Sequence, residues 1–133
     1  MYVSAALFPT FAFELDNAWF LSAAVFFLGI AIIAISGIQF RKASTTVNPL
    51  TPEKTSSLVV TGIYGFSRNP MYVGFFLFLL SVSIFLANVV TLVFLPLFVL
   101  IMNRYQIQPE EKVLETIFGD KYRQYLDSVR RWL

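Results

Sequence analysis

Two long runs of apolar residues constrain the fold of this chain more than any other feature. The first, Ala18–Phe40, spans 23 residues without a charge, and the second, Met71–Ile107, is nearly unbroken and too long for one membrane pass. A helix of about 20 apolar residues crosses the hydrocarbon core of a bilayer. The composition agrees, because 57% of the 133 residues are hydrophobic and only 14% are charged, against about 25% in soluble domains. We therefore predict an all-α integral membrane protein.

Polar residues divide the first half of the chain into two predicted helices. Residues 1–15 are apolar but few, and Pro9 interrupts them. We expect a short, kinked helix that also spans the membrane, with an interfacial helix or a re-entrant segment as alternatives. Residues 18–40 form the first long transmembrane helix, and small residues such as Gly29 allow a neighbouring helix to approach closely.

The second apolar run is expected to fold as a hairpin. Ala87-Asn88 is the only polar interruption near its middle, so a tight turn there separates transmembrane helices at 70–86 and 89–107. Pro96 has no amide hydrogen and is expected to bend the second of these helices. The predicted fold is polytopic, with three long transmembrane helices and the short N-terminal helix.

Two polar segments, 41–69 and 108–133, complete the chain. Prolines and a Ser/Thr-rich composition predict an irregular loop for the first. The second is predicted to be a helical tail whose last part has one apolar face and basic residues elsewhere, which is typical of a helix on an anionic membrane surface. All ten Lys and Arg fall on the side of these two segments. The positive-inside rule therefore places both in the cytoplasm, with the chain in the plasma (inner) membrane.

The residue types that are missing exclude several kinds of chemistry. The chain has no Cys and no His, so disulfides, thiolate nucleophiles and the usual neutral-pH general base are absent. We predict no metal site and no covalent intermediate. A net charge of +2, scattered among apolar segments, does not favour nucleic acid as a partner. The sequence carries no signal for an oligomeric state.

The start of the predicted helix at 70–86 has two interpretations. Asn69-Pro70 is a favoured helix beginning, and Arg68 beside it can anchor in lipid phosphates. A helix N-terminus also presents free amide hydrogens to an anionic group, and Tyr64 and Tyr72 put two phenols around the same point. Both interpretations, a helix cap and a binding site, are open from the sequence.

Two adjacent carboxylates, Glu110-Glu111, follow the hairpin. A solvated helix face is the simpler interpretation for Glu110. However, carboxylates at a membrane boundary are costly when partly buried, unless they meet a cation. Because the hairpin is antiparallel, these carboxylates and Asn69-Pro70 are expected to be neighbours. A zwitterionic ligand with an ammonium and a carboxylate would satisfy both ends of such a site.

Two motifs carry a family resemblance. LVVTGIYGFSRNPMYVG at 58–74 and EEKVLETIFGDKYRQYLDSVRRWL at 110–133 resemble the isoprenylcysteine carboxyl methyltransferase and phospholipid methyltransferase superfamily of membrane enzymes. The resemblance implies S-adenosylmethionine as methyl donor, bound at the cytoplasmic boundary. It also implies a lipophilic acceptor from the bilayer, either an isoprenylcysteine-like carboxylate or a phospholipid amine.

The resemblance also implies residue roles by position. The adenosine side of the donor would be lined by Val59, Val60, Gly62 and Tyr64. The ribose and methionine portions would lie near Asn69, Pro70 and Tyr72. The donor's ammonium would face Glu110 and Glu111, with Glu111 and Arg68 as the candidate catalytic residues; Arg68 would hold the donor, the acceptor or a phosphate.

One departure from the family pattern concerns the acceptor. Eukaryotic carboxyl methyltransferases tend to have an Arg about one turn before the second Glu, where this chain has Gln106, and Arg104 is the nearest substitute. Two alternatives stay open from the residues alone. One is an NADPH-dependent membrane enzyme similar to sterol reductases, and the other is a small non-catalytic membrane subunit.

Overall fold

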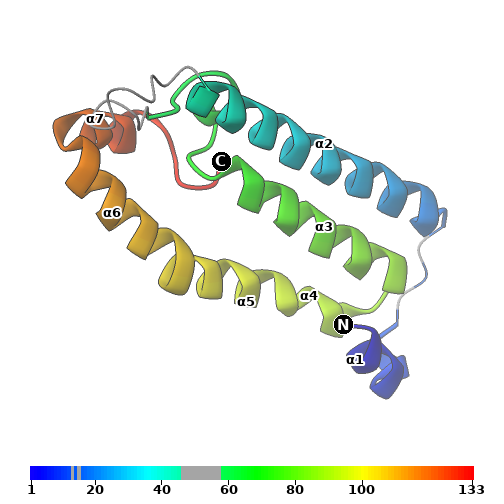
Figure 1. Cartoon of the computed structure of the whole chain (residues 1–133). Helices are drawn as coiled ribbons and strands as arrows, with labels where there is room; N and C mark the ends of the chain where they lie inside the picture. Colours follow the sequence, from blue (N-terminus) through cyan, green and yellow to red (C-terminus); the bar gives the residue numbers. More distant parts are fainter. Residues whose placement is uncertain (13, 15, 46–57) are drawn as a thin grey trace.

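The computed structural model describes residues 1–12, 14, 16–45 and 58–133, and over these residues it is helical, without a strand (Figure 1). The elements are α1 (Tyr2–Leu7), η1 (Pro9–Phe11), α2 (Ala18–Thr45), η3 (Gly62–Gly65), α3 (Pro70–Leu86), α4 (Val89–Leu92), α5 (Phe94–Ile101), the π-helical turn η4 (Met102–Ile107), α6 (Gln108–Phe118) and α7 (Asp120–Ser128). The predicted all-α class is confirmed. The part of the predicted loop at 46–57 lies outside the described residues.

Two of the three predicted long spans meet the length and hydropathy expected of a membrane-spanning helix. These are α2 and the nearly continuous helix Val89–Phe118. Only 11% and 17% of their most apolar windows are buried inside the protein, so most of these side chains face outward. α3 keeps the predicted bounds but has 17 residues, which at about 1.5 Å per residue is shorter than the ~30 Å hydrocarbon core. α3 lies between the two longer helices (Figure 1).

The predicted N-terminal membrane pass is wrong. α1 has six residues and ends before Pro9 begins a separate 3-10 turn, far short of the ~20 residues that a spanning helix needs. The Asn88 side-chain amide donates to the carbonyl oxygens of Phe8 at 2.9 Å and Ala5 at 3.4 Å. The N-terminal segment therefore covers the α3–α4 turn, at the opposite end of the molecule from α7 (Figure 1).

α2 and α3 pack closely through small residues. A Cβ built on Gly29 would lie 2.9 Å from the carbonyl oxygen of Gly74 in α3, and a Cβ on Gly74 would lie closer still to Ile33. Ser22 in α2 donates to the carbonyl of Ser81 in α3 at 2.9 Å. Both glycines are therefore needed for the two backbones to approach each other, as small residues permit between membrane helices.

The hairpin turns at the predicted position. Ala87 adopts a left-handed conformation with φ of 44°, and the Asn88 side chain accepts from the Val90 amide at 2.9 Å. The following helix is interrupted at Val93, between α4 and α5. Pro96 accounts for that position, because it removes the hydrogen bond to the carbonyl four residues earlier and crowds that turn.

α6 begins at Gln108, the residue where the helical tail was predicted to begin, and the placement of that tail outside the membrane stays a prediction. α5 continues through the π-helical turn η4 directly into α6, and α6 leans away from α3 (Figure 1). α6 ends at Gly119, where φ is 56°, and α7 begins at Asp120. The expected membrane-facing surface of this last helix turns inward instead, because Tyr122 and Tyr125 are only 2% and 6% exposed.

Candidate active site

The loop before α3 takes its shape from side-chain hydrogen bonds to the backbone. Asn69 occupies the N-cap position of α3 and Pro70 the first helical position, but the Asn69 side chain makes no capping bond. It donates instead to the carbonyl of Arg131 at 3.0 Å, and Ser67 Oγ accepts from the Asn69 amide at 3.1 Å. Asn69 therefore starts the helix by position while its amide binds the other end of the chain.

A cavity of about 110 Å³ lies where this loop meets α2, α6 and α7. Its walls are formed by Phe40, Leu58, Val59, Tyr64, Arg68, Asn69, Glu110, Glu111, Leu114, Phe118, Tyr122 and Tyr125. An adjoining cavity of about 230 Å³ shares six of these residues and adds Pro70, Met71 and Tyr72. The two motifs thus meet in space, as the hairpin argument predicted, and together they enclose a largely apolar site with a few charged groups.

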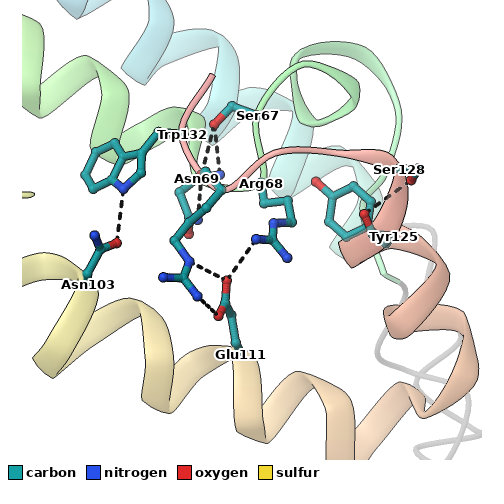
Figure 2. Close-up of polar contacts among 9 residues, drawn as sticks. Ser67, Arg68, Asn69, Asn103, Glu111, Tyr125, Ser128 and Trp132 are labelled. Carbon is teal, nitrogen blue, oxygen red and sulfur yellow. Dashed lines mark hydrogen bonds and ion pairs between the residues drawn. The ribbon is translucent and has the colours of Figure 1, made fainter.

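Glu111 lies between two arginines, and we refer to Arg68, Glu111 and Arg131 as the arginine–glutamate cluster. Arg131 Nε donates to Glu111 Oε1 at 3.0 Å and its terminal nitrogen donates to Oε2 at 2.7 Å. The guanidinium of Arg68 is 3.5 Å from Glu111 Oε1. Figure 2 shows Glu111 reaching from α6 toward Arg68. The side chains of Arg68 and Glu111 are 11% and 16% exposed, so the pairing is largely shielded from water.

The segment after α7 holds Arg131 in place through its backbone. The carbonyl of Arg130 accepts from the Arg68 amide at 3.0 Å. The indole of Trp132 donates to Asn103 Oδ1, in the π-helical turn, at 3.0 Å (Figure 2). The C-terminal residues therefore bridge the loop before α3 and the helix that carries the carboxylates.

Glu110 has neutral neighbours. The phenol of Tyr72 donates to its two carboxylate oxygens at 3.0 and 3.2 Å, and Gln106 also donates to its carboxylate. Glu110 forms no ion pair among the described residues, although it lines both cavities. Among the described residues, only neutral groups donate to the Glu110 carboxylate.

Three tyrosines close the inner side of the cavity. Tyr125 donates to the carbonyl of Tyr64 at 2.6 Å, and the phenol of Tyr64 donates to the carbonyl of Ser36 at 3.3 Å. Burial raises the pKa of Tyr122 and of Tyr125 to about 12, and the nearby charge of Glu111 adds to the effect at Tyr122. Burial also raises the pKa of Tyr64. These phenols stay protonated near neutral pH, and those of Tyr64 and Tyr125 serve as donors.

The structure brings most of the predicted site residues to the two cavities. Val59, Tyr64, Arg68, Asn69, Glu110 and Glu111 line the first, and Pro70 and Tyr72 line the second. Val60 lines a separate groove with Leu58 and Tyr125. Gly62, at φ of +62°, lies against Gln39, whose side chain accepts from the Ile63 amide at 3.0 Å. Gly62 is therefore needed for the turn rather than in the cavity wall.

Other residues of the site were missed or placed differently by sequence. Tyr122, Tyr125 and Arg131 were expected at the membrane surface, because aromatic and basic residues near the end of a membrane protein are typical anchors. Tyr125 instead donates to Tyr64 and Arg131 to Glu111, and these partners are distant in sequence. Arg104, the expected substitute for a substrate clamp, is exposed and lines neither cavity.

Comparison with known proteins gives a family match. The family model described as phospholipid methyltransferase matches residues 17–121. An uncharacterized protein of Haemophilus influenzae is 43% identical over 63 residues, which are 47% of this chain and all of that protein. Protein-S-isoprenylcysteine O-methyltransferase of Schizosaccharomyces pombe is 29% identical over 129 residues, or 96% of this chain and 55% of that enzyme.

The enzyme of the same name from Saccharomyces cerevisiae is 34% identical over 80 residues, or 58% of this chain and 32% of that enzyme. The chain thus spans about half or less of the length of these two yeast enzymes. The family match, by contrast, covers well over half of this chain and includes the loop before α3, the carboxylates of α6 and the start of α7. The chain belongs to the phospholipid methyltransferase family.

Proposed function

We propose that this chain transfers a methyl group from S-adenosylmethionine to a lipophilic acceptor drawn from the bilayer. One observation carries the proposal. Two motifs about 40 residues apart in sequence line one cavity, which places the buried cation of Arg68 and the carboxylate of Glu110 around it. The family match, and relatives named protein-S-isoprenylcysteine O-methyltransferase, support the same reaction class.

The residues present fit a zwitterionic donor. Arg68 Nε is buried and has no hydrogen-bond partner, and such a donor normally finds an acceptor. A ligand carboxylate would supply one, and Glu110 would receive a ligand ammonium. The adenosine side would lie along Val59 and Tyr64, which line the same cavity. S-adenosylmethionine, when bound, supplies a methyl group on a positively charged sulfur.

The chain's own contribution is orientation and the exclusion of water. Direct displacement at a sulfonium methyl group needs alignment of donor and acceptor more than it needs side-chain chemistry. The apolar residues Phe40, Leu114 and Phe118 line the cavity and limit the access of water. Low polarity also strengthens the attraction between an anionic acceptor and the sulfonium.

The acid–base properties of the site favour a carboxylate as the accepting group. A carboxylate is already ionised near neutral pH, whereas an ammonium must first lose a proton. Tyr122 and Tyr125, with pKa values raised to about 12, keep their own protons. An isoprenylcysteine-like carboxylate therefore suits the site better than a phospholipid amine.

An apolar groove beside the site suits the lipophilic part of the acceptor. It is lined by Val73, Phe76, Val99, Trp132 and Leu133, and has a volume of about 200 Å³. The groove shares no lining residue with the two cavities, but Val73 and Trp132 are the chain neighbours of Tyr72 and Arg131. With the basic loop and tail on the cytoplasmic side of the inner membrane, the donor would reach the site from the cytoplasm and the acceptor from the bilayer.

A methyl-transfer assay with labelled donor tests the function. The protein, in lipid nanodiscs, is given donor labelled in the methyl group and either a prenylated cysteine with a free carboxylate or phosphatidylethanolamine. We expect label in the prenylated cysteine, in a form released by mild base because it is an ester. Absence of transfer to both acceptors, together with absence of donor binding, would contradict the proposal.

A further inference from the structure

The two adjacent carboxylates of α6 have opposite electrostatic surroundings. Glu111 accepts two hydrogen bonds from Arg131 and lies 3.5 Å from Arg68. One negative charge there faces two positive charges, which leaves the arginine–glutamate cluster with a net charge of +1. Glu110 accepts hydrogen bonds only from the neutral Tyr72 and Gln106 among the described residues. Glu110 thus keeps its own charge of −1, without an ion-pair partner among the described residues.

This difference decides where the two ends of a zwitterion bind. A bidentate arginine–carboxylate pair is a strong arrangement, and breaking a largely buried pair leaves an uncompensated charge. A ligand ammonium at Glu111 would have to displace Arg131 and approach a cluster that is already positive. At Glu110 it meets an uncompensated carboxylate instead. The ligand carboxylate is attracted to the positive cluster, where Arg68 has a free Nε–H.

Arg131 is held where it can maintain this difference. Its carbonyl accepts from the Asn69 side chain at 3.0 Å, and the carbonyl of the preceding Arg130 accepts from the Arg68 amide at 3.0 Å. Trp132 follows Arg131, and its indole donates to Asn103 at 3.0 Å. The backbone on both sides of Arg131 is thus anchored, and its side chain reaches Glu111 from the last residues of the second motif.

We propose that Arg131 is a positioning residue that neutralises Glu111 and so divides the two carboxylates between different tasks. Glu110 receives the ammonium of the donor's methionine portion. Arg68, oriented by Glu111, receives its carboxylate. This inference rests on the proposed function, because it concerns the same donor site.

Calorimetry with two probes tests the division. S-adenosylhomocysteine carries the ammonium and the carboxylate, whereas 5′-methylthioadenosine lacks both. Glu110→Gln should lower the affinity for S-adenosylhomocysteine about tenfold or more, the size expected for one hydrogen bond to a charged group. The same variant should leave the affinity for 5′-methylthioadenosine nearly unchanged. Glu115→Gln, which removes an exposed carboxylate of the same helix that lines neither cavity, is the matched control.

The role of Arg131 is tested by a double-mutant cycle. Arg131→Gln should weaken the binding of S-adenosylhomocysteine, because it lowers the net charge of the cluster from +1 to 0, whereas Glu111→Gln raises that charge to +2 and should not weaken binding. The double variant restores the net charge of +1 around Arg68 and should recover most of the affinity. Removing both partners of a pair costs much less than removing one. A structural defect alone would weaken both probes together.

Direct contact between Glu111 and the ammonium would give the reverse pattern. Arg131→Gln would then raise the affinity for S-adenosylhomocysteine, because Arg131 would no longer compete with the ammonium for Glu111. The double variant would bind as weakly as Glu111→Gln. Either result overturns the inference, as does an unchanged affinity in Glu110→Gln. If the unmodified protein binds neither probe, the proposed function itself fails, which distinguishes the two outcomes.

Discussion

Two faces of α3 are stabilised in different ways. Toward α2, close packing of small residues holds the helix, with the backbones in near contact at Gly29 and Gly74. At its N-terminus α3 is separated from α6 (Figure 1), and the space between them is bridged by hydrogen bonds and ion pairs. Arg131 contributes to both sides of that bridge, through its carbonyl to Asn69 and through its guanidinium to Glu111.

The two faces of α3 differ in the room that they leave for a ligand. A close-packed helix pair leaves no room and gains nothing from charge. The bridged end contains cavities of about 110 and 230 Å³ lined by charged and aromatic groups. Its polar contacts can be exchanged for contacts with a ligand at the water boundary, so the scaffold and the site occupy different faces of the same helix.

The largest effect on stability is expected at the close-packed part. Gly74→Val places a branched side chain against Ile33 and within 2.9 Å of the Gly29 carbonyl oxygen. Overpacking of this kind costs about 1–3 kcal/mol, and thermal unfolding in detergent measures it. Gly37→Val is the matched control, because a Cβ there meets nothing within 4 Å. Equal losses in both variants would contradict the packing account.

A smaller effect is expected from one hydrogen bond at the bridged end. Tyr125→Phe removes the donor to the Tyr64 carbonyl, a bond of 2.6 Å, and should cost about 1 kcal/mol of unfolding free energy. Tyr105→Phe is the control, since Tyr105 is 76% exposed. If the two variants unfold at the same temperature, the inward orientation of α7 is wrong.

Alkaline pH should loosen the bridged end. Tyr122 and Tyr125 have pKa values of about 12 against an ordinary 10.0. The unfolded chain therefore releases these protons first as pH rises. Their contribution to stability is complete below pH 10 and is lost between about pH 10 and 12. Unfolding measured across this range should show the loss, and Tyr122→Phe should make it shallower; an unchanged slope would refute the burial of that phenol.

The smallest effect is expected at the exposed outer face of α7. Arg123 pairs with Glu115 at 2.8 Å and with Asp120 at 3.3 Å, but its side chain is 62% exposed. Exposed pairs contribute little and are screened by salt. Arg123→Ala should leave the unfolding temperature and the affinity for S-adenosylhomocysteine within experimental error. A clear loss of affinity would extend the site to this face.

Much of the scaffold was predictable from sequence because local signals specify it. The uncharged run that becomes α2, the Asn69-Pro70 start of α3 and the turn at Ala87-Asn88 each depend on neighbouring residues. The N-terminal helix was misjudged, because its apolar residues cover the Asn88 turn instead of crossing the bilayer. The polar residues at the start of α6 suggested that the preceding helix ends there. No stronger sequence signal indicated that the helix continues.

The site was predictable only in part, for a related reason. The antiparallel hairpin brings Arg68 and Asn69 near Glu110 and Glu111, and that follows from topology. The partner of Glu111 does not, since Arg131 is 20 residues away and is positioned by Asn69, 62 residues away. Basic residues in this last segment look the same in sequence whether they contact lipid headgroups or line a binding site.

Amide hydrogen exchange with and without S-adenosylhomocysteine tests whether the bridged end is the donor site. The account predicts slower exchange in the bound protein over residues 58–69 and in α6 and α7, where the cavities lie. The α2–α3 interface around Gly29 and Gly74 should show no change. Protection confined to that interface, or an identical exchange pattern with and without ligand, would contradict the assignment of the bridged end as the donor site.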